Sequence, residues 1–447
     1  MGRFALHGAA RLVTMSQNCL QKSGAAGDAP RLGSRVAMER VVSFLGLLVV
    51  MVLAWLLSEN RRAMNWRLIA SGIVLQLLLA VTLLWTAPGQ AVFQAARDFI
   101  TRLVEFSDAG AEFVFGSGDP KLPETYKHHY LAFKVLPTII FVSTVMAVLF
   151  HLGVMQWVVR AMAWIMVRVM DTSGTESLAA ASEVFVGMTE SPLVIRPYLE
   201  SMTRSEIMAM MTAGMGTVAG GVMAAYVGMG IDAGHLLAAS LMAAPASLVI
   251  AKIMVPETES SLTKGTVRIE VPRTDVNVLD AACRGASEGL RLALNVAAML
   301  IAFVALVHAL NWALSVLPPV AGAPLSLERM LGWLCAPLAW VLGVEWKDAR
   351  LVGMLLGKKI VLNEFLAYSD LQALRAQLSP RSAIIATYAL CGFANFGSVA
   401  VQIGGVGGLV PSRREVFARY GLRAMVGGAL ATLMTATIAG ILIGTPS

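Results

Sequence analysis

The chain has 447 residues, of which 57% are hydrophobic and 14% are charged. Ordinary soluble domains carry roughly 25% charged residues, so this composition excludes a water-soluble protein. The net charge of +7 arises from basic residues in short loops beside apolar segments, a pattern typical of membrane proteins and not of nucleic-acid binding proteins.

Residues 1–37 are rich in Arg, Gly and Ala and lack the continuous apolar stretch of a signal peptide. A targeting arm, a disordered tail and an upstream start codon would each produce such a segment. We favour the upstream start codon, so that 1–37 is a poorly defined tail and 38–447 forms a single domain that begins at Met38.

Eight later segments approach the ~20 apolar residues that a helix needs to cross the hydrocarbon core of a bilayer. The basic residues Arg61, Arg62 and Arg67 follow the first segment and mark that loop as cytoplasmic. The sequence therefore predicts an all-α, multi-pass protein of the cell (inner or plasma) membrane, with both termini on the outer side. The predicted spans are 41–57, 66–86, 131–153, 207–229, 234–254, 292–317, 382–405 and 417–444.

Three connecting segments alternate charged and apolar residues at helical spacing, at 89–107, 155–170 and 276–291. This pattern predicts interfacial helices that lie along the membrane surface. We expect them to support the spans.

Two further apolar segments do not fit simple spans because polar residues interrupt them. Residues 176–200 contain Gly187-Met188-Thr189-Glu190-Ser191-Pro192, and residues 348–370 contain Asn363-Glu364. A charged residue at membrane depth costs at least ~2.5 kcal/mol on insertion scales, and irregular backbone is tolerated there only where it lines a cavity or is buried in protein. The pattern predicts two re-entrant hairpins with polar tips.

The two hairpins belong to a predicted inverted repeat. Each is followed by a span that small and polar residues break, at 214–221 and at 392–398. The loop charges place the first hairpin on the inner side and the second on the outer side. In secondary transporters such repeats hold the substrate near the membrane midplane. The alternative is that the small residues only let membrane helices pack closely.

Several motifs occur in order between residues 41 and 444, and with them the chain resembles the concentrative nucleoside transporters. The motifs are 136–141 (LPTIIF), 186–199 (VGMTESPLVIRPYL), 243–246 (AAPA), 256–259 (PETE), 363–365 (NEF) and 392–396 (GFANF). The resemblance implies a cation-coupled symporter that imports nucleosides by alternating access, with no covalent chemistry and no cofactor. Its expected partners are the nucleoside, the lipid bilayer and further copies of the chain in a homotrimer.

The resemblance also implies a division of the chain into a scaffold, at about 66–153 and 292–345, and a mobile transport region, at about 172–254 and 346–444. Residues carried over by motif fall on the hairpins and their partner spans. The nucleobase would meet Met188, Thr189, Glu190 and Val222. The ribose would meet Glu364, Phe393, Asn395 and Ser398. A carboxylate and an amide are suitable acceptors for ribose hydroxyls, but the two Glu side chains could instead form a structural contact between the hairpins.

Met188 departs from the pattern of many members that accept pyrimidines, which carry Gln at this position. A Gln amide can donate to and accept from a pyrimidine edge, whereas the Met thioether offers mainly polarizable apolar contact. The sequence therefore favours purine nucleosides.

The resemblance places the coupling cation, Na+, between the first hairpin and the following span. The matching positions are Glu183, Val186, Thr217 and Val218. Glu183 puts a carboxylate where the family has an amide; it suits a hard cation, but a buried carboxylate can also hold a proton. Na+ is the primary prediction and H+ the alternative, and an ion pair of Glu183 with Arg196 or Arg204 is a structural alternative.

Two other functional classes compete with a carrier. An ion channel also uses re-entrant hairpins, but channels build selectivity from repeated rings of carbonyls or charges, whereas two unlike polar tips face one site here. A membrane-embedded enzyme acting on lipid is the second rival.

Overall fold

The computed structural model describes residues 38–115, 131–265, 275–320 and 322–443. Within these ranges the chain is helical, with two isolated β-bridges and no strand. The predicted tail at 1–37 lies outside the described residues.

Seven helices in the described ranges are long and apolar enough to cross a membrane, which confirms the predicted all-α, multi-pass fold. They account for seven of the eight predicted spans. They are Met38–Leu56, α2 (Trp66–Trp85), Ala132–His151 with α4 (Leu136–His151), Arg204–Gly228, α10 (Ala233–Met254), α11 (Val278–Ser315), and Pro411–Leu442 with α18 (Arg414–Leu442).

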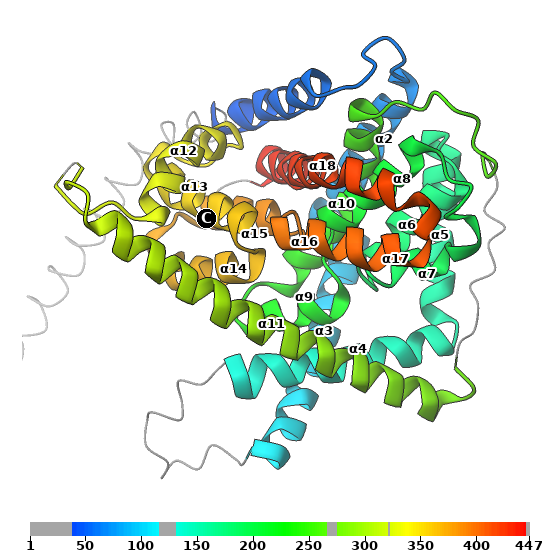
Figure 1. Cartoon of the computed structure of the whole chain (residues 1–447), viewed down its shortest axis with the longest axis horizontal. Coiled ribbons are helices and arrows are strands. Elements are labelled where there is room, and N and C mark those ends of the chain that lie inside the picture. Colours follow the sequence, from blue (N-terminus) through cyan, green and yellow to red (C-terminus); the bar gives the residue numbers. More distant parts are fainter. Residues whose placement is uncertain (1–37, 116–130, 266–274, 321, 444–447) are drawn as a thin grey trace, which may run out of the picture.

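The structure corrects the prediction for residues 276–317. The predicted interfacial helix and the predicted span form one continuous helix, α11, of 38 residues. The segment contains no proline, and a change from charged to apolar side chains does not interrupt helical hydrogen bonds. Figure 1 shows α11 as a long rod along one edge of the molecule.

The eighth predicted span, 382–405, is broken within the predicted interruption at 392–398. Helix α15 (Pro380–Leu390) ends before Gly392, and α16 (Phe396–Val401) starts after Asn395. A π-helical turn (Gln402–Val406) and α17 (Gly407–Leu409) follow. The other broken span has the same design, because Thr217-Val218-Ala219 separate α8 (Arg204–Gly216) from α9 (Gly220–Gly228).

Both predicted hairpins are interrupted at their polar residues. Hairpin one, residues 174–200, contains α6 (Gly174–Glu183), α7 (Ser191–Val194) and a 3-10 turn (Arg196–Tyr198). Hairpin two, residues 346–374, contains α13 (Trp346–Val361) and α14 (Glu364–Leu374). Before it, α12 (Leu327–Val341) meets α13 at an angle of 117°, and Gly343 in the connection has a φ of +96°.

The remaining helices are α3 (Ala87–Phe115) and α5 (Val154–Met170), at the positions of two predicted interfacial helices. Their location at the membrane surface stays a prediction.

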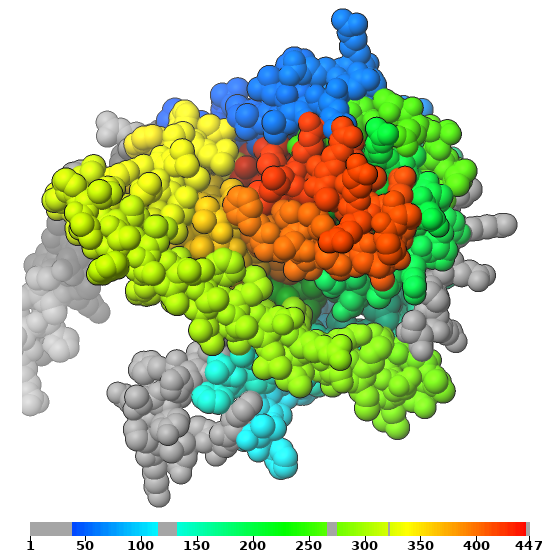
Figure 2. Space-filling model, viewed as in Figure 1, coloured from blue at the N-terminus to red at the C-terminus, as the bar shows by residue number. Residues whose placement is uncertain are grey.

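The core of the molecule surrounds α8, α9, α10 and α18. In the most apolar window of α8–α9, 94% of the residues are buried, against only 17% for α11. Figure 2 shows α11 along the outer rim of one face, with the C-terminal helices at the centre of that face. The broken helices are therefore in the interior, while α11 presents most of its apolar surface outward.

Candidate functional site

Glu364 lies at the centre of a buried hydrogen-bond cluster that joins three helices. Its carboxylate accepts hydrogen bonds from the Asn395 side-chain amide at 2.9 Å and from the Tyr226 hydroxyl at 3.0 Å. Glu364 begins α14, Asn395 precedes α16, and Tyr226 lies on α9. The three residues are 6%, 3% and 0% exposed. Hairpin two and both broken spans therefore meet at one carboxylate.

Asn363 and Asn395 both act as helix N-caps. The Asn363 side-chain oxygen accepts from the Leu366 amide at 2.9 Å, and the Asn395 oxygen accepts from the Ser398 amide at 2.9 Å. Asn is a favoured N-cap because its oxygen satisfies an amide that has no partner within the helix. Ser398, which is buried, lies in the first turn of α16. The positive ends of α14 and α16 thus adjoin the polar cluster.

The two broken spans approach each other closely at Gly392. A methyl group at Gly392 would lie 2.9 Å from the carbonyl oxygens of Met215 and Gly216, at the end of α8. Only glycine leaves room for this contact between backbones. Phe393, which follows Gly392, is half-buried, and its carbonyl accepts from the Asn395 amide at 2.9 Å. The two interruptions in the sequence are therefore neighbours in space.

The tip of hairpin one packs against the break between α8 and α9. The Gly220 amide donates to the Phe185 carbonyl at 2.9 Å. Gly187 has a φ of +93°, and a methyl group there would lie 2.8 Å from Ala219 Cβ, so the tip requires glycine. Met188 follows Gly187 and is half-buried, whereas Thr189 is exposed.

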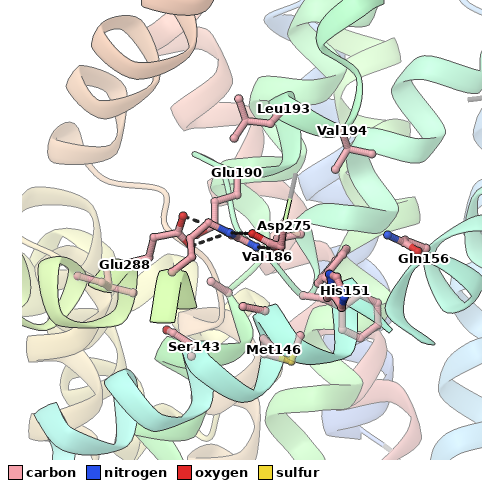
Figure 3. Close-up of a pocket in the computed structure, with 17 residues that line it drawn as sticks. Ser143, Met146, His151, Gln156, Val186, Glu190, Leu193, Val194, Asp275 and Glu288 are labelled. Atoms are coloured by element: carbon pink, nitrogen blue, oxygen red, sulfur yellow. Dashed lines mark hydrogen bonds and ion pairs between the residues drawn. The ribbon is translucent and has the colours of Figure 1, made fainter. Parts of the chain in front are cut away.

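Glu190 and Val186 line a cavity between hairpin one, α4, α9 and α11. In Figure 3 Glu190 extends toward the ion pairs that Arg284 of α11 makes with Asp275 and Glu288. Glu190 forms no hydrogen bond with hairpin two among the described residues. The alternative of a structural contact between the two Glu-bearing tips is therefore not observed.

Val222 and Tyr226 share one face of α9, because residues four apart lie one above the other on a helix. Val222 is 4% exposed. The predicted apolar wall and the hydroxyl that binds Glu364 thus belong to the same helix face.

The predicted cation positions lie on two segments that contact each other. Thr217 and Val218 are buried in the break after α8, and the Thr217 hydroxyl donates to the Ala213 carbonyl at 2.8 Å. Glu183 ends α6, is 1% exposed, and neither of its carboxylate oxygens has a hydrogen-bond partner in the described part of the chain. Buried polar atoms are nearly always paired, and carboxylates are good ligands for hard cations.

The structural alternative for Glu183 is not observed. Arg196 is exposed, and Arg204 forms an ion pair with Glu259 at 3.4 Å. Among the described residues, neither arginine is hydrogen-bonded to Glu183. The carboxylate is therefore available to a ligand.

Sequence reasoning missed Tyr226 and Gln402, which adjoin the predicted residues. The Gln402 side chain donates to the Met211 carbonyl at 3.2 Å and is 2% exposed. One feature of the sequence could have indicated Tyr226: it lies four residues after Val222 and therefore on the same helix face. Gln402 had one also, its position as a polar residue within the apolar stretch that follows Ser398.

Three family models match the chain in succession. They are described as "Na+ dependent nucleoside transporter N-terminus", matching residues 45–118, "Nucleoside recognition" (Gate), matching residues 132–233, and "Na+ dependent nucleoside transporter C-terminus", matching residues 235–440.

Curated relatives match most of the chain. Solute carrier family 28 member 3 of Homo sapiens is 43% identical over 431 residues, covering 92% of this chain and 61% of the human protein. The chain thus spans about three-fifths of the length of that relative. An uncharacterized transporter of Haemophilus influenzae is 42% identical over 418 residues, covering 91% of this chain and 99% of the relative.

Solved structures share the fold. A structure of CNTnw in an inward-facing substrate-bound state is 40% identical, with a TM-score of 0.83, covering 90% of this chain and 97% of CNTnw. A CNTnw variant in an outward-facing state is 41% identical, with a TM-score of 0.86, covering 91% of this chain and 99% of that one.

Proposed function

Because the chain belongs to the Na+ dependent nucleoside transporter family, we propose that it is a symporter that imports nucleosides with a cation across the cell membrane by alternating access. The buried cluster of Glu364, Asn395 and Tyr226 carries the proposal. It brings polar groups from a hairpin and two broken spans together, as secondary transporters do at their substrate sites. Transport needs no covalent step, so we propose no enzymatic activity.

Ribose recognition falls to hairpin two and its partner span. The Glu364 carboxylate can accept a hydrogen bond from a ribose hydroxyl, while Asn395 and Tyr226 hold it in place. The Ser398 hydroxyl supplies a further polar group, and the Phe393 ring supports the sugar or base face. The nucleobase meets Met188, Thr189, Glu190 and the apolar wall at Val222.

We propose a preference for purine nucleosides. The Met188 thioether provides polarizable apolar contact and lacks the paired donor and acceptor that a Gln amide would offer to a pyrimidine edge. Purine rings present a larger apolar face to such a contact.

Na+ is the proposed coupling ion, bound by Glu183, Val186, Thr217 and Val218. The buried carboxylate of Glu183, which has no hydrogen-bond partner among the residues that the structure describes, supports an ion at this place. The same observation favours a second candidate, a proton carried by Glu183, which would make the chain a proton-coupled permease.

We further propose a homotrimer in which each protomer carries its own transport path. Within a protomer, residues at about 172–254 and 346–444 move relative to a scaffold at about 66–153 and 292–345, and both termini lie outside the cell. The outward-facing apolar surface of α11 supports its contact with lipid or with a neighbouring protomer.

Uptake of radiolabelled inosine and uridine into proteoliposomes, under separately imposed sodium and proton gradients, tests these proposals. Wild type and Glu183→Asn are compared. We expect saturable, gradient-driven uptake that unlabelled nucleoside blocks. Inosine should be taken up faster than uridine. Glu183→Asn should keep sodium-driven uptake and lose any proton-driven uptake.

Three other outcomes would contradict the proposed symporter. No uptake under either gradient would reject the symporter, unsaturated ion current would favour a channel, and chemically altered substrate inside the vesicles would favour an enzyme.

A further inference from the structure

Gly214 on α8 marks a point where three parts of the proposed site meet. A methyl group at Gly214 would lie 2.7 Å from Gln402 Nε2, 3.2 Å from Glu183 Oε1 and 2.8 Å from Met188 Cβ. These side chains come from the π-helical turn after α16, from the end of α6 and from the tip of hairpin one. The Gln402 amide and the Glu183 carboxylate therefore face one small space, called here the Gly214 gap.

Gln402 is connected directly to the proposed ribose residues. Its backbone amide donates to the Ser398 carbonyl, and it follows Asn395 by seven residues, about two helical turns. The π-helical turn begins at Gln402, and such turns are frequent at functional sites. A displacement of Gln402 is therefore passed to the helix that carries Ser398 and begins at Asn395.

Three acceptor oxygens near the gap have no hydrogen-bond partner in the described part of the chain. The Gln402 Nε2 group donates to Met211, but the Gln402 side-chain oxygen has no hydrogen-bond partner among the described residues, and the same holds for both Glu183 oxygens. The Gln402 atom nearest the gap is the amide nitrogen, so the side-chain oxygen reaches the gap when the amide rotates. A cation or a proton would then satisfy both acceptors, because neither oxygen can donate to the other.

We propose that Gln402 is a positioning residue that couples the ion site to the ribose site by sharing the coupling ion with Glu183. Its side-chain oxygen acts as a ligand of Na+, or as the acceptor for a proton held by Glu183. Ion binding then draws Gln402 toward Glu183 and fixes α16, so that Asn395 and Ser398 are held ready for ribose. This inference rests on the proposed function.

Reciprocity gives the inference a measurable form. If ion binding raises the affinity for the nucleoside by some factor, the nucleoside must raise the affinity for the ion by the same factor. Such couplings amount to about 5–150-fold in affinity. Loss of the Gln402 oxygen should reduce this factor and leave the ribose groups themselves in place.

The test measures equilibrium binding of labelled inosine to the purified full-length protein, in sodium buffer and in sodium-free choline buffer, at neutral and at acidic pH. Gln402→Met keeps the side chain's length and removes its polar atoms, while Gln402→Glu retains an oxygen. Gln76→Met is the matched control, because Gln76 is 0% exposed and donates to Thr435 at 3.0 Å but lies on α2. Its side-chain oxygen also has no partner among the described residues.

We expect wild type to bind inosine more tightly when the coupling ion is present. The ratio of the inosine affinity with the coupling ion to the affinity without it should fall about tenfold in Gln402→Met, while the ion-free affinity changes by less than about threefold. Gln402→Glu and Gln76→Met should keep a ratio near that of wild type. Tighter inosine binding in sodium buffer identifies Na+ as the shared ion, and tighter binding in acidic choline buffer identifies a proton.

A wild-type ratio in Gln402→Met, or an equal loss in Gln76→Met, would overturn the inference. If Gln402→Met does not fold, Gln402→Glu decides: loss of ion dependence in this folded, oxygen-bearing variant contradicts the inference, and its retention supports it. Failure of wild type to bind inosine or uridine in any buffer would instead overturn the proposed function.

Discussion

The Asn395 side chain donates to Glu364 at 2.9 Å with its amide nitrogen, while its oxygen caps α16. One side chain thus connects the hairpin-two carboxylate to the start of the helix that carries Ser398. The Tyr226 hydroxyl provides the second hydrogen bond to the same carboxylate. The orientation of Glu364 is therefore set by groups from both halves of the repeat.

Tyr226→Phe removes only the hydroxyl and keeps the ring packed against Tyr368, 4.4 Å away. We expect the KM for inosine uptake to rise about tenfold, because hydrogen bonds to charged groups contribute about 1.5–3 kcal/mol. Tyr420→Phe is the control, since its hydroxyl donates to Glu59 at 3.2 Å, outside the proposed site. Equal changes in the two variants would contradict the role of Tyr226.

Met188→Gln should shift selectivity toward pyrimidine nucleosides. A new amide at the hairpin-one tip can form a hydrogen bond worth about 0.5–1.5 kcal/mol to a pyrimidine edge, which raises the uridine-to-inosine uptake ratio by about 2–12-fold. Competition uptake measures this ratio, and Met330→Gln on the exposed face of α12 should leave it unchanged. Cytidine or thymidine out-competing inosine in wild type, with no effect of Met188→Gln, would refute the purine preference.

Gly392→Ala should lower thermal stability. The added methyl group would meet two backbone carbonyls at 2.9 Å, and such overpacking typically costs about 1–3 kcal/mol. Gly404→Ala is a suitable comparison, because nothing lies within 4 Å of a methyl group there. Thermal unfolding of the purified protein should separate the two variants; matching midpoints would show that the broken spans tolerate separation at Gly392.

Lys252→Met should destabilise the base of hairpin one. The Lys252 ammonium, whose side chain is 6% exposed, pairs with Glu176 at 2.7 Å and with Glu257 at 3.2 Å. Removing one partner of a buried ion pair costs about 3–5 kcal/mol. The exposed Lys347–Glu345 pair should contribute about 0–1 kcal/mol, so Lys347→Met serves as the control. Scanning fluorimetry checks both, and a comparable shift in each would reject a special role for Lys252.

The helix breaks could be predicted from the sequence because polar residues interrupt otherwise apolar segments. Asn363 and Asn395 each cap the helix that follows them, so their effect is local. Tyr226 and Gln402 could not be assigned in this way, because their partners are distant in sequence. Glu364 lies 138 residues from Tyr226, and Met211 lies 191 residues from Gln402. An aromatic or amide side chain in a span looks the same whether it serves packing or binding.

The error in the predicted fold came from a boundary that hydropathy does not determine. The change from charged to apolar residues near 291 was interpreted as a helix end, yet α11 continues through it. In contrast, the break that small and polar residues predict at 392–398 is present, because Asn395 caps a new helix within 382–405. Helices end where backbone amides find other partners, and side-chain polarity alone does not report that.

The continuous α11 also links transport to the thickness of the bilayer. Its 38 residues extend about 57 Å, nearly twice the ~30 Å hydrocarbon core, so the helix must tilt or project beyond it. Near its start Arg284 borders hairpin one, and near its end Asn311 donates to Glu328 of α12 at 3.0 Å, close to hairpin two. Lipids with longer acyl chains would bring this helix closer to the membrane normal and alter the spacing between hairpins one and two. Acyl-chain length would thereby affect the proposed transport cycle through one uninterrupted helix.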